Sequence, residues 1–167
     1  MSPLRYAAYG SNLHPRRLEA RVPSAQLLGT ARLPGFVLGF NKRGMDGSAK
    51  CGIVAGRDEV RVAVYSLAPG DRAGLDRLEH AGTGYEVIDV DVPGYGTCFT
   101  YRVADAWFVS GLAPFCWYHE MVLKGMRLHG FPADYVAAIE SVVPVRDPDA
   151  ARRTENQRLL QTMEAAA

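Results

Sequence analysis

Hydrophobic residues in the first two thirds of the chain alternate with polar ones, or form short runs that end at glycine, proline or polar clusters. Both patterns are typical of strands. Val60, Val62 and Val64, for example, would share one face of a strand that ends at Leu67. The strands predicted in this way cover residues 4–9, 25–33, 36–41, 52–55, 60–67, 86–92 and 97–103.

Helical periodicity replaces this pattern between Pro69-Gly70 and about His80, and again in the last third of the chain. Tyr118, Met121 and Val122 recur at helical spacing, and Gly125 continues the same face. The predicted helices cover 15–20, 70–80, the stretch from 114 to the break at 130–132, and 133–141.

The order of the elements favours an α+β fold, because strands come first and helices gather at the end instead of alternating with the strands. Seven short strands are enough for a small closed β-barrel or a strongly bent β-barrel-like sheet with flanking helices. We expect one domain over residues 1–167, in which 146–167 is a peripheral, loosely docked C-terminal tail.

Charge and composition exclude several classes of partner. Lysine and arginine nearly balance aspartate and glutamate, and the net charge of +1 gives no basic surface for nucleic acid. The three cysteines, Cys51, Cys98 and Cys116, are odd in number and lack CxxC spacing, which favours free thiols in a reducing compartment. Because we find neither a signal pattern nor an apolar run of ~18 residues, we expect a cytoplasmic protein without a membrane partner.

Cofactor and metal motifs are missing from the sequence. None of the four histidines has a spacing that suits a metal site, and no GxGxxG motif follows a strand. We therefore expect neither a metal nor a cofactor.

The stretch Tyr9-Gly10-Ser11-Asn12-Leu13 lies where the first strand should turn into the first helix. Gly10 permits another molecule to approach the backbone closely. Consecutive backbone N–H groups at 10–12 could form a site for an anion. An ordinary strand-to-helix turn would have the same local sequence, so both interpretations remain open at this point.

Glu79 stands out among the charged residues of the predicted helix at 70–80. Leu75 and Leu78 should define its buried side, and Glu79, four residues after Leu75, falls on that same side. A carboxylate directed inward has to be hydrogen-bonded, paired with a cation or shifted in pKa. It is either a structural acid at a helix end, paired with an arginine or reaching solvent, or a general acid/base in a cavity.

Several segments together resemble the γ-glutamylcyclotransferase-like family, over residues 6 to about 139. The first is the loop Tyr9-Gly10-Ser11-Asn12-Leu13, and the second is Leu75-Asp76-x-x-Glu79, followed by glycines and Tyr85-Glu86-Val87-Ile88. The remaining ones are Asp46-Gly47-Ser48-Ala49-Lys50-Cys51-Gly52-Ile53, Pro114-x-x-Trp117-Tyr118 with Gly125, and Phe131-Pro132-x-x-Tyr135.

The resemblance implies a cyclotransferase that acts on a small γ-glutamyl substrate. The substrate's own α-amine would attack its γ-carbonyl and release 5-oxoproline, with Glu79 as the catalytic general acid/base. The loop residues Tyr9, Gly10, Ser11, Asn12 and Leu13 would bind the substrate, together with Tyr85 and Tyr118. Each of the three tyrosines could equally be a core aromatic residue.

Three functions remain open from the sequence. The substrate could be a γ-glutamyl amino acid or peptide, or a γ-glutamylamine, and the segments 42–50 and 107–114 could set that choice. A binding module of the same fold without turnover is the third. The sequence leaves the oligomeric state, monomer or homodimer, undecided.

Overall fold

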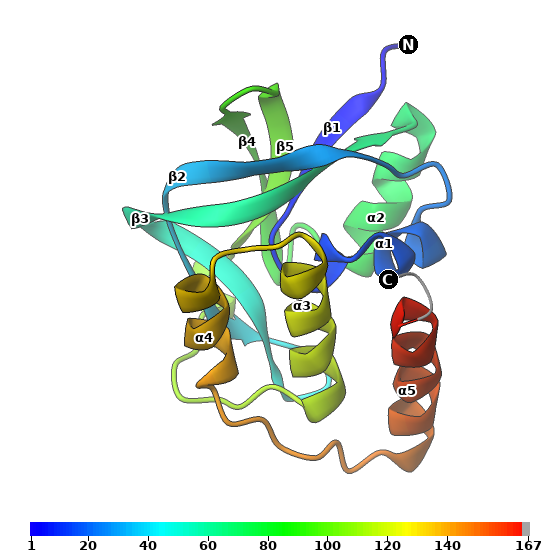
Figure 1. Cartoon of the computed structure of the whole chain (residues 1–167), viewed down its shortest axis with the longest axis vertical. Helices are drawn as coiled ribbons and strands as arrows, with labels where there is room; N and C mark the ends of the chain where they lie inside the picture. Colours follow the sequence, from blue (N-terminus) through cyan, green and yellow to red (C-terminus); the bar gives the residue numbers. More distant parts are fainter. Residues whose placement is uncertain (165–167) are drawn as a thin grey trace.

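The computed structural model describes residues 1–164 as a five-stranded sheet covered by helices (Figure 1). The strand order is β2-β3-β1-β5-β4, and all neighbours are antiparallel except β1 and β5. The strands are β1 (Leu4–Ala8), β2 (Gln26–Arg43), β3 (Ala49–Leu67), β4 (Tyr85–Val92) and β5 (Gly96–Val103).

The helices that follow the strands confirm the α+β class. The α-helices are α1 (Pro15–Arg21), α2 (Arg72–Leu78), α3 (Cys116–Leu128), α4 (Ala133–Glu140) and α5 (Ala150–Glu164). Three short 3-10 helices are η1 (Ser11–Leu13), η2 (Pro69–Asp71) and η3 (Asp105–Trp107). In Figure 1, α3 lies between α4 and α5, and it contacts both.

The number of strands differs from the sequence prediction. The predicted strands 25–33 and 36–41 are one strand, β2, and 52–55 and 60–67 are likewise one strand, β3. Gly35 and the polar Arg57-Asp58-Glu59 do not break the pairing, because the ladder passes from Pro34–Glu59 to Phe36–Ala55 through a bulge. Three residues of β3 oppose one residue of β2 there, which bends the ribbon.

The sheet is open, with β2 and β4 at its edges. Of the two predicted forms, the closed barrel is therefore wrong and the strongly bent sheet is the one that forms. In Figure 1 the long β2–β3 ribbon crosses over the shorter strands instead of lying flat beside them. The central strand β1 has neighbours on both sides, so its end is buried, and the chain leaves it inside the protein.

The predicted faces of the helices are confirmed in part. Tyr118, Met121, Val122 and Gly125 are all buried on one side of α3. Leu75 of α2 is fully buried, but Leu78 is 45% exposed, so its assignment to the buried side is wrong. The helix ends at Leu78, and this side chain lies at the edge of a cavity instead of over the core.

The C-terminal segment is held to the rest of the protein by buried side chains. Leu160 and Met163 of α5 are buried, and α5 packs on α3 and α1. Asp147, before α5, is 1% exposed. The last residues of the predicted tail, 165–167, lie outside the described residues.

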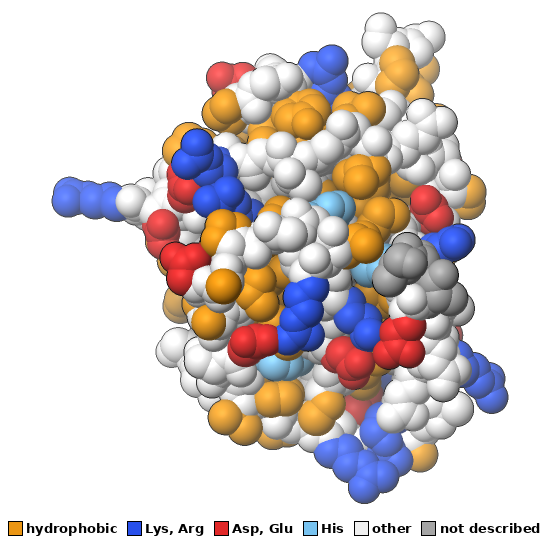
Figure 2. All heavy atoms as spheres, viewed as in Figure 1, with side chains coloured by type: hydrophobic (Ala, Val, Ile, Leu, Met, Phe, Trp, Pro, Cys, Tyr) orange, Lys and Arg blue, Asp and Glu red, His pale blue; other side chains and the backbone are white. Residues whose placement is uncertain are grey.

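Two further features are the distribution of charge on the surface and the length of the helices. On the face drawn in Figure 2, acidic and basic side chains are intermixed, in agreement with the balanced composition. No helix within residues 1–164 combines the length and the apolar character that a membrane crossing requires.

Candidate active site

The loop between β1 and α1 lies inside the molecule. Ser11 is 9% and Asn12 is 4% exposed, so their polar side chains need partners within the protein or from a ligand. His14 ends the loop and caps α1, since its Nδ1 accepts a hydrogen bond from the Arg16 amide at 3.2 Å. Within residues 1–164, the backbone hydrogen bonds outside the regular helices and strands include none from the amides of Gly10, Ser11 and Asn12, which makes these groups candidate donors to an anion.

Glu79 lies directly after α2 and points at this loop. The Asn12 side-chain amide donates to Glu79 Oε1 at 3.0 Å, and the same Nδ2 contacts the Tyr6 hydroxyl at 3.1 Å. The Arg21 guanidinium also donates to Oε1 and reaches Asn12 Oδ1 at 3.1 Å. Two donors, Asn12 and Arg21, thus fix one oxygen of a carboxylate that lies far from both of them in the sequence. Within residues 1–164, no hydrogen bond or ion pair involves the other oxygen, Oε2.

A cavity of about 240 Å³ opens beside Glu79. A recess of about 20 Å³ adjoins it behind the loop, and Ser11, Glu79, Tyr85 and Tyr118 line both spaces. Tyr9, Gly10 and Asn12 line only the recess. The predicted acid, the loop and a hollow between them therefore occur together.

Leu13 is the one predicted site residue that lies away from these spaces. Its side chain is fully buried in the core, and its carbonyl accepts hydrogen bonds from the Tyr65 hydroxyl at 2.8 Å and from His129 Nε2 at 2.6 Å. The structure thus gives Leu13 the task of anchoring the end of the loop.

The three predicted tyrosines are both core aromatics and cavity walls. The Tyr9 hydroxyl donates to the Tyr101 carbonyl and the Tyr85 hydroxyl to the Cys51 carbonyl, each at 2.5 Å. The Tyr118 hydroxyl accepts from the Cys51 amide at 3.0 Å. Burial raises the pKa of Tyr9, Tyr85 and Tyr118 well above the usual range, so all three are neutral at physiological pH. They shape the cavity without acting as bases.

Four cationic side chains line the cavity: Arg17, Arg21, Lys42 and Lys50. The sequence pointed to none of them individually, although it named the segment 42–50 as one that could set the choice of substrate. Arg17 and Arg21 lie four residues apart on α1, a spacing that could have placed them on one face. Lys42 and Lys50 are direct partners across the β2–β3 ladder, so they share a face of the sheet. That pairing is visible only once the hairpin register is known.

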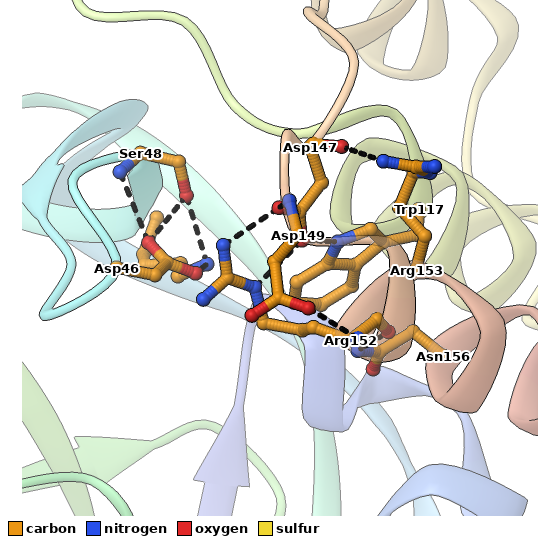
Figure 3. Close-up of polar contacts among 9 residues, drawn as sticks. Asp46, Ser48, Trp117, Asp147, Asp149, Arg152, Arg153 and Asn156 are labelled. Atoms are coloured by element: carbon orange, nitrogen blue, oxygen red, sulfur yellow. Dashed lines mark hydrogen bonds and ion pairs between the residues drawn. The ribbon is translucent and has the colours of Figure 1, made fainter.

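Trp117, another wall of the cavity, is held by the segment before α5. Its indole Nε1 donates to Asp147 Oδ2 at 2.9 Å, and Arg152 donates to both oxygens of Asp147 at 2.6 Å (Figure 3). Figure 3 places this cluster next to Asp46 and Ser48, which belong to the loop between β2 and β3. The Arg152 guanidinium holds the pKa of the Asp147 carboxyl well below its usual range.

We expect Asp147→Asn to lower stability by about 2 kcal/mol, because hydrogen bonds to a charged acceptor are lost. For a chain of this size the loss corresponds to a fall in Tm of roughly 4–8 °C, measurable by calorimetry at pH 7. Since the pKa is lower in the folded state, the contribution is complete above the unfolded value of ~3.9 and disappears as the pH falls below it. The difference in Tm should therefore shrink below about pH 4. Asp89→Asn, at an exposed position of β4, is the matched control.

A larger hollow, of about 720 Å³, lies elsewhere, between β2, β3 and the turn from α3 to α4. Its acid, Glu59, lies 3.7 Å from Arg32 and 3.7 Å from Arg61 on the rim. It contains neither Glu79 nor the loop at 9–13. We therefore place the candidate site at the smaller cavity.

Comparison with known proteins identifies the family of this chain. The family model described as "Gamma-glutamyl cyclotransferase, AIG2-like" matches residues 6–112. The chain belongs to that family. It is similar to the gamma-glutamylcyclotransferases of Bos taurus and Homo sapiens, each 30% identical over 150 residues that cover 83% of this chain and 78% of the relative. A solved structure of a gamma-glutamyl cyclotransferase superposes with a TM-score of 0.79 at 25% identity, covering 93% of this chain and 99% of that one.

Proposed function

We propose that this protein is a γ-glutamylcyclotransferase-type enzyme, which forms 5-oxoproline from a γ-glutamyl amino acid or peptide. The observation that carries the proposal is the arrangement of Glu79, which lies beside a small cavity and is held by Arg21 and by Asn12 of the loop at 9–13. Membership of the family and the named activity of its relatives support the same reaction.

In this reaction the substrate supplies its own nucleophile. The α-amine nitrogen forms a bond to the γ-carbonyl carbon, and the proton that the amine loses passes to Glu79. The bond between that carbon and the departing nitrogen then breaks, and Glu79 returns the proton to the departing nitrogen. The products are 5-oxoproline and a free amine or amino acid, so atoms balance without a further reactant.

The geometry of Glu79 suits a proton carrier. Asn12 and Arg21 hold Oε1 in place, and Oε2 remains to exchange the proton. Holding the γ-glutamyl chain in a folded, near-attack conformation is the other main contribution, since such positioning can lower a barrier by up to roughly 7–11 kcal/mol. The buried aromatic walls of the cavity provide the fixed shape that this requires.

The loop amides provide for negative charge. The N–H groups of Gly10, Ser11 and Asn12 are oriented by the turn that follows β1, where they would bind the α-carboxylate of the substrate or the oxyanion that forms at the γ-carbonyl. In acyl-transfer enzymes, removal of one donor to the oxyanion typically costs about 10²–10³ in rate.

Two other functions are alternatives to this proposal. A γ-glutamylamine cyclotransferase would use the same chemistry with a different departing group. A module that binds γ-glutamyl compounds without turnover would need the cavity but no acid, and Glu79 beside the cavity favours the enzyme. The free thiols at Cys51, Cys98 and Cys116 support a reducing, cytoplasmic location.

The proposal is tested by incubating the purified protein with a panel of γ-glutamyl amino acids, γ-glutamyl peptides and γ-glutamylamines and measuring 5-oxoproline by mass spectrometry. We expect 5-oxoproline from at least one γ-glutamyl amino acid or peptide. Saturable binding of these compounds in calorimetry, with no 5-oxoproline from any of them, would instead show the binding module.

A further inference from the structure

The cavity contains more positive charge than the protein neutralises. Arg21 is paired with Glu79, and Lys50 is paired with Asp46 at 2.8 Å. Arg17 and Lys42 also line the cavity, and within residues 1–164 neither side chain forms an ion pair or a side-chain hydrogen bond. Two cations therefore face the cavity without an ion pair of their own, because its two carboxylates, Glu79 and Asp46, are paired with Arg21 and Lys50.

Lys42 is the less exposed residue of these two. It is 3% exposed, and its Nζ lies 4.7 Å from the centre of the Tyr85 ring and 5.3 Å from that of Trp107. Burial lowers the pKa of Lys42 from its ordinary value. A lysine that is largely removed from solvent and has no protein anion of its own is costly, so such a group is a candidate for a site whose partner arrives with the ligand.

The neighbouring backbone leaves room for this ammonium. A Cβ at Gly84 would come within 2.7 Å of Lys42 Nζ and 2.6 Å of its Cε. The glycine before β4 thus permits Lys42 to lie between Tyr85 and Trp107. Both segments that the sequence suggested for the choice of departing group, 42–50 and 107–114, contribute a residue to this arrangement.

We propose that Lys42 binds the carboxylate of the departing amino acid and thereby makes the cavity select γ-glutamyl compounds whose amine carries a carboxylate. This inference rests on the proposed cyclotransferase function. Arg17 comes from α1, directly after the loop at 9–13, and so belongs with the glutamyl end of the substrate. Lys42 comes from β2 and stands beside Tyr85 and Trp107, which leaves it for the other end.

The test compares two substrates that differ only in the carboxylate, γ-glutamylalanine and γ-glutamylethylamine. For the unmodified protein we expect a kcat/KM at least about tenfold higher for γ-glutamylalanine. Lys42→Met keeps most of the aliphatic stem on the aromatic rings but removes the charge. It should lower the ratio of the two kcat/KM values by about 10- to 100-fold, as expected for a hydrogen bond between two charged groups.

Two further variants separate charge from position. Arg43→Met removes the same charge from the next residue of β2, which is exposed and does not line the cavity, and it should preserve the ratio. Gly84→Ala keeps Lys42 but displaces its ammonium, and it should lower the ratio as Lys42→Met does. Thermal unfolding of each variant checks that the fold is retained.

Binding to Glu79→Gln, measured by calorimetry, provides a readout that does not depend on turnover. We expect tighter binding of γ-glutamylalanine than of γ-glutamylethylamine, and loss of this preference in Glu79→Gln/Lys42→Met. Two results would overturn the proposed role of Lys42 and leave the proposed cyclotransferase function standing. One is equal turnover and equal binding of the two compounds by the protein with Lys42 intact, and the other is an unchanged kcat/KM ratio in Lys42→Met. Absence of 5-oxoproline from every γ-glutamyl compound would instead remove the proposed function.

Discussion

Glu79→Gln is expected to reduce the release of 5-oxoproline by about 10³-fold or more, while the protein remains folded. General acid/base groups typically contribute 10²–10⁴ to a rate, and here one group would serve both proton transfers. Glutamine keeps a carbonyl oxygen that can accept the hydrogen bonds of Asn12 and Arg21, so the loop and α1 should stay in place. The measurement is kcat for γ-glutamylalanine, with circular dichroism and thermal unfolding alongside.

Two controls accompany this variant. Glu86→Gln makes the same change at an exposed acid of β4 that is paired with Arg102, and it should leave kcat unchanged. Glu79→Asp keeps the carboxyl group but withdraws it from the cavity, and should be intermediate. A Glu79→Gln protein that still turns over at the original rate would assign the proton transfer to another group.

Gly10→Ala should lower kcat/KM by about 100-fold, the second largest effect that we expect. A Cβ at position 10 would come within 2.8 Å of the Cβ of Cys51 and 3.6 Å of the Tyr118 hydroxyl oxygen. The Cys51 Cβ is fixed to the backbone of β3 and cannot rotate away, so the loop itself must move. A displacement of 1 Å in a catalytic arrangement can cost 10²-fold.

The cause of this effect can be tested by a compensating change. Cys51→Gly removes the contacted Cβ, so Gly10→Ala should do less harm in that background. We expect Gly10→Ala to lower kcat/KM at least tenfold less when it is added to Cys51→Gly than when it is added to the unmodified protein. Gly70→Ala, where a Cβ would meet nothing within 4 Å, is the control for an added methyl group. Full activity in Gly10→Ala would mean that the distance between loop and acid does not limit the reaction.

Local sequence patterns were sufficient for the parts of the site that depend on neighbouring residues. The turn after β1 and the inward Glu79 follow from residues that are close together in the chain. Leu78 shows the limit of that reasoning, because the helix ends one residue before Glu79 and the predicted apolar side does not continue. The residue at which a helix ends depends on tertiary contacts as well as on the local sequence.

The features that the sequence did not predict depend on partners far away in the chain. The turn-like Arg57-Asp58-Glu59 stays within β3 only because β2 runs opposite it with a bulge. Lys42 and Lys50 lie opposite each other only because β2 and β3 pair in this register. Trp117 and Asp147 meet although thirty residues separate them, and nothing in either local pattern indicates the other.

The tie between Trp117 and Asp147 has a practical consequence for anyone who cuts or recombines this chain. The stretch that matches the family ends at residue 112, whereas Trp117, Tyr118 and Asp147 all follow it. A fragment trimmed to the matched stretch would keep Glu79 and the turn at 10–12 but lose one wall of the cavity. Conversely, exchanging only the C-terminal segment after residue 112 between related chains offers a way to change the wall of the cavity without altering Glu79 or the turn at 10–12.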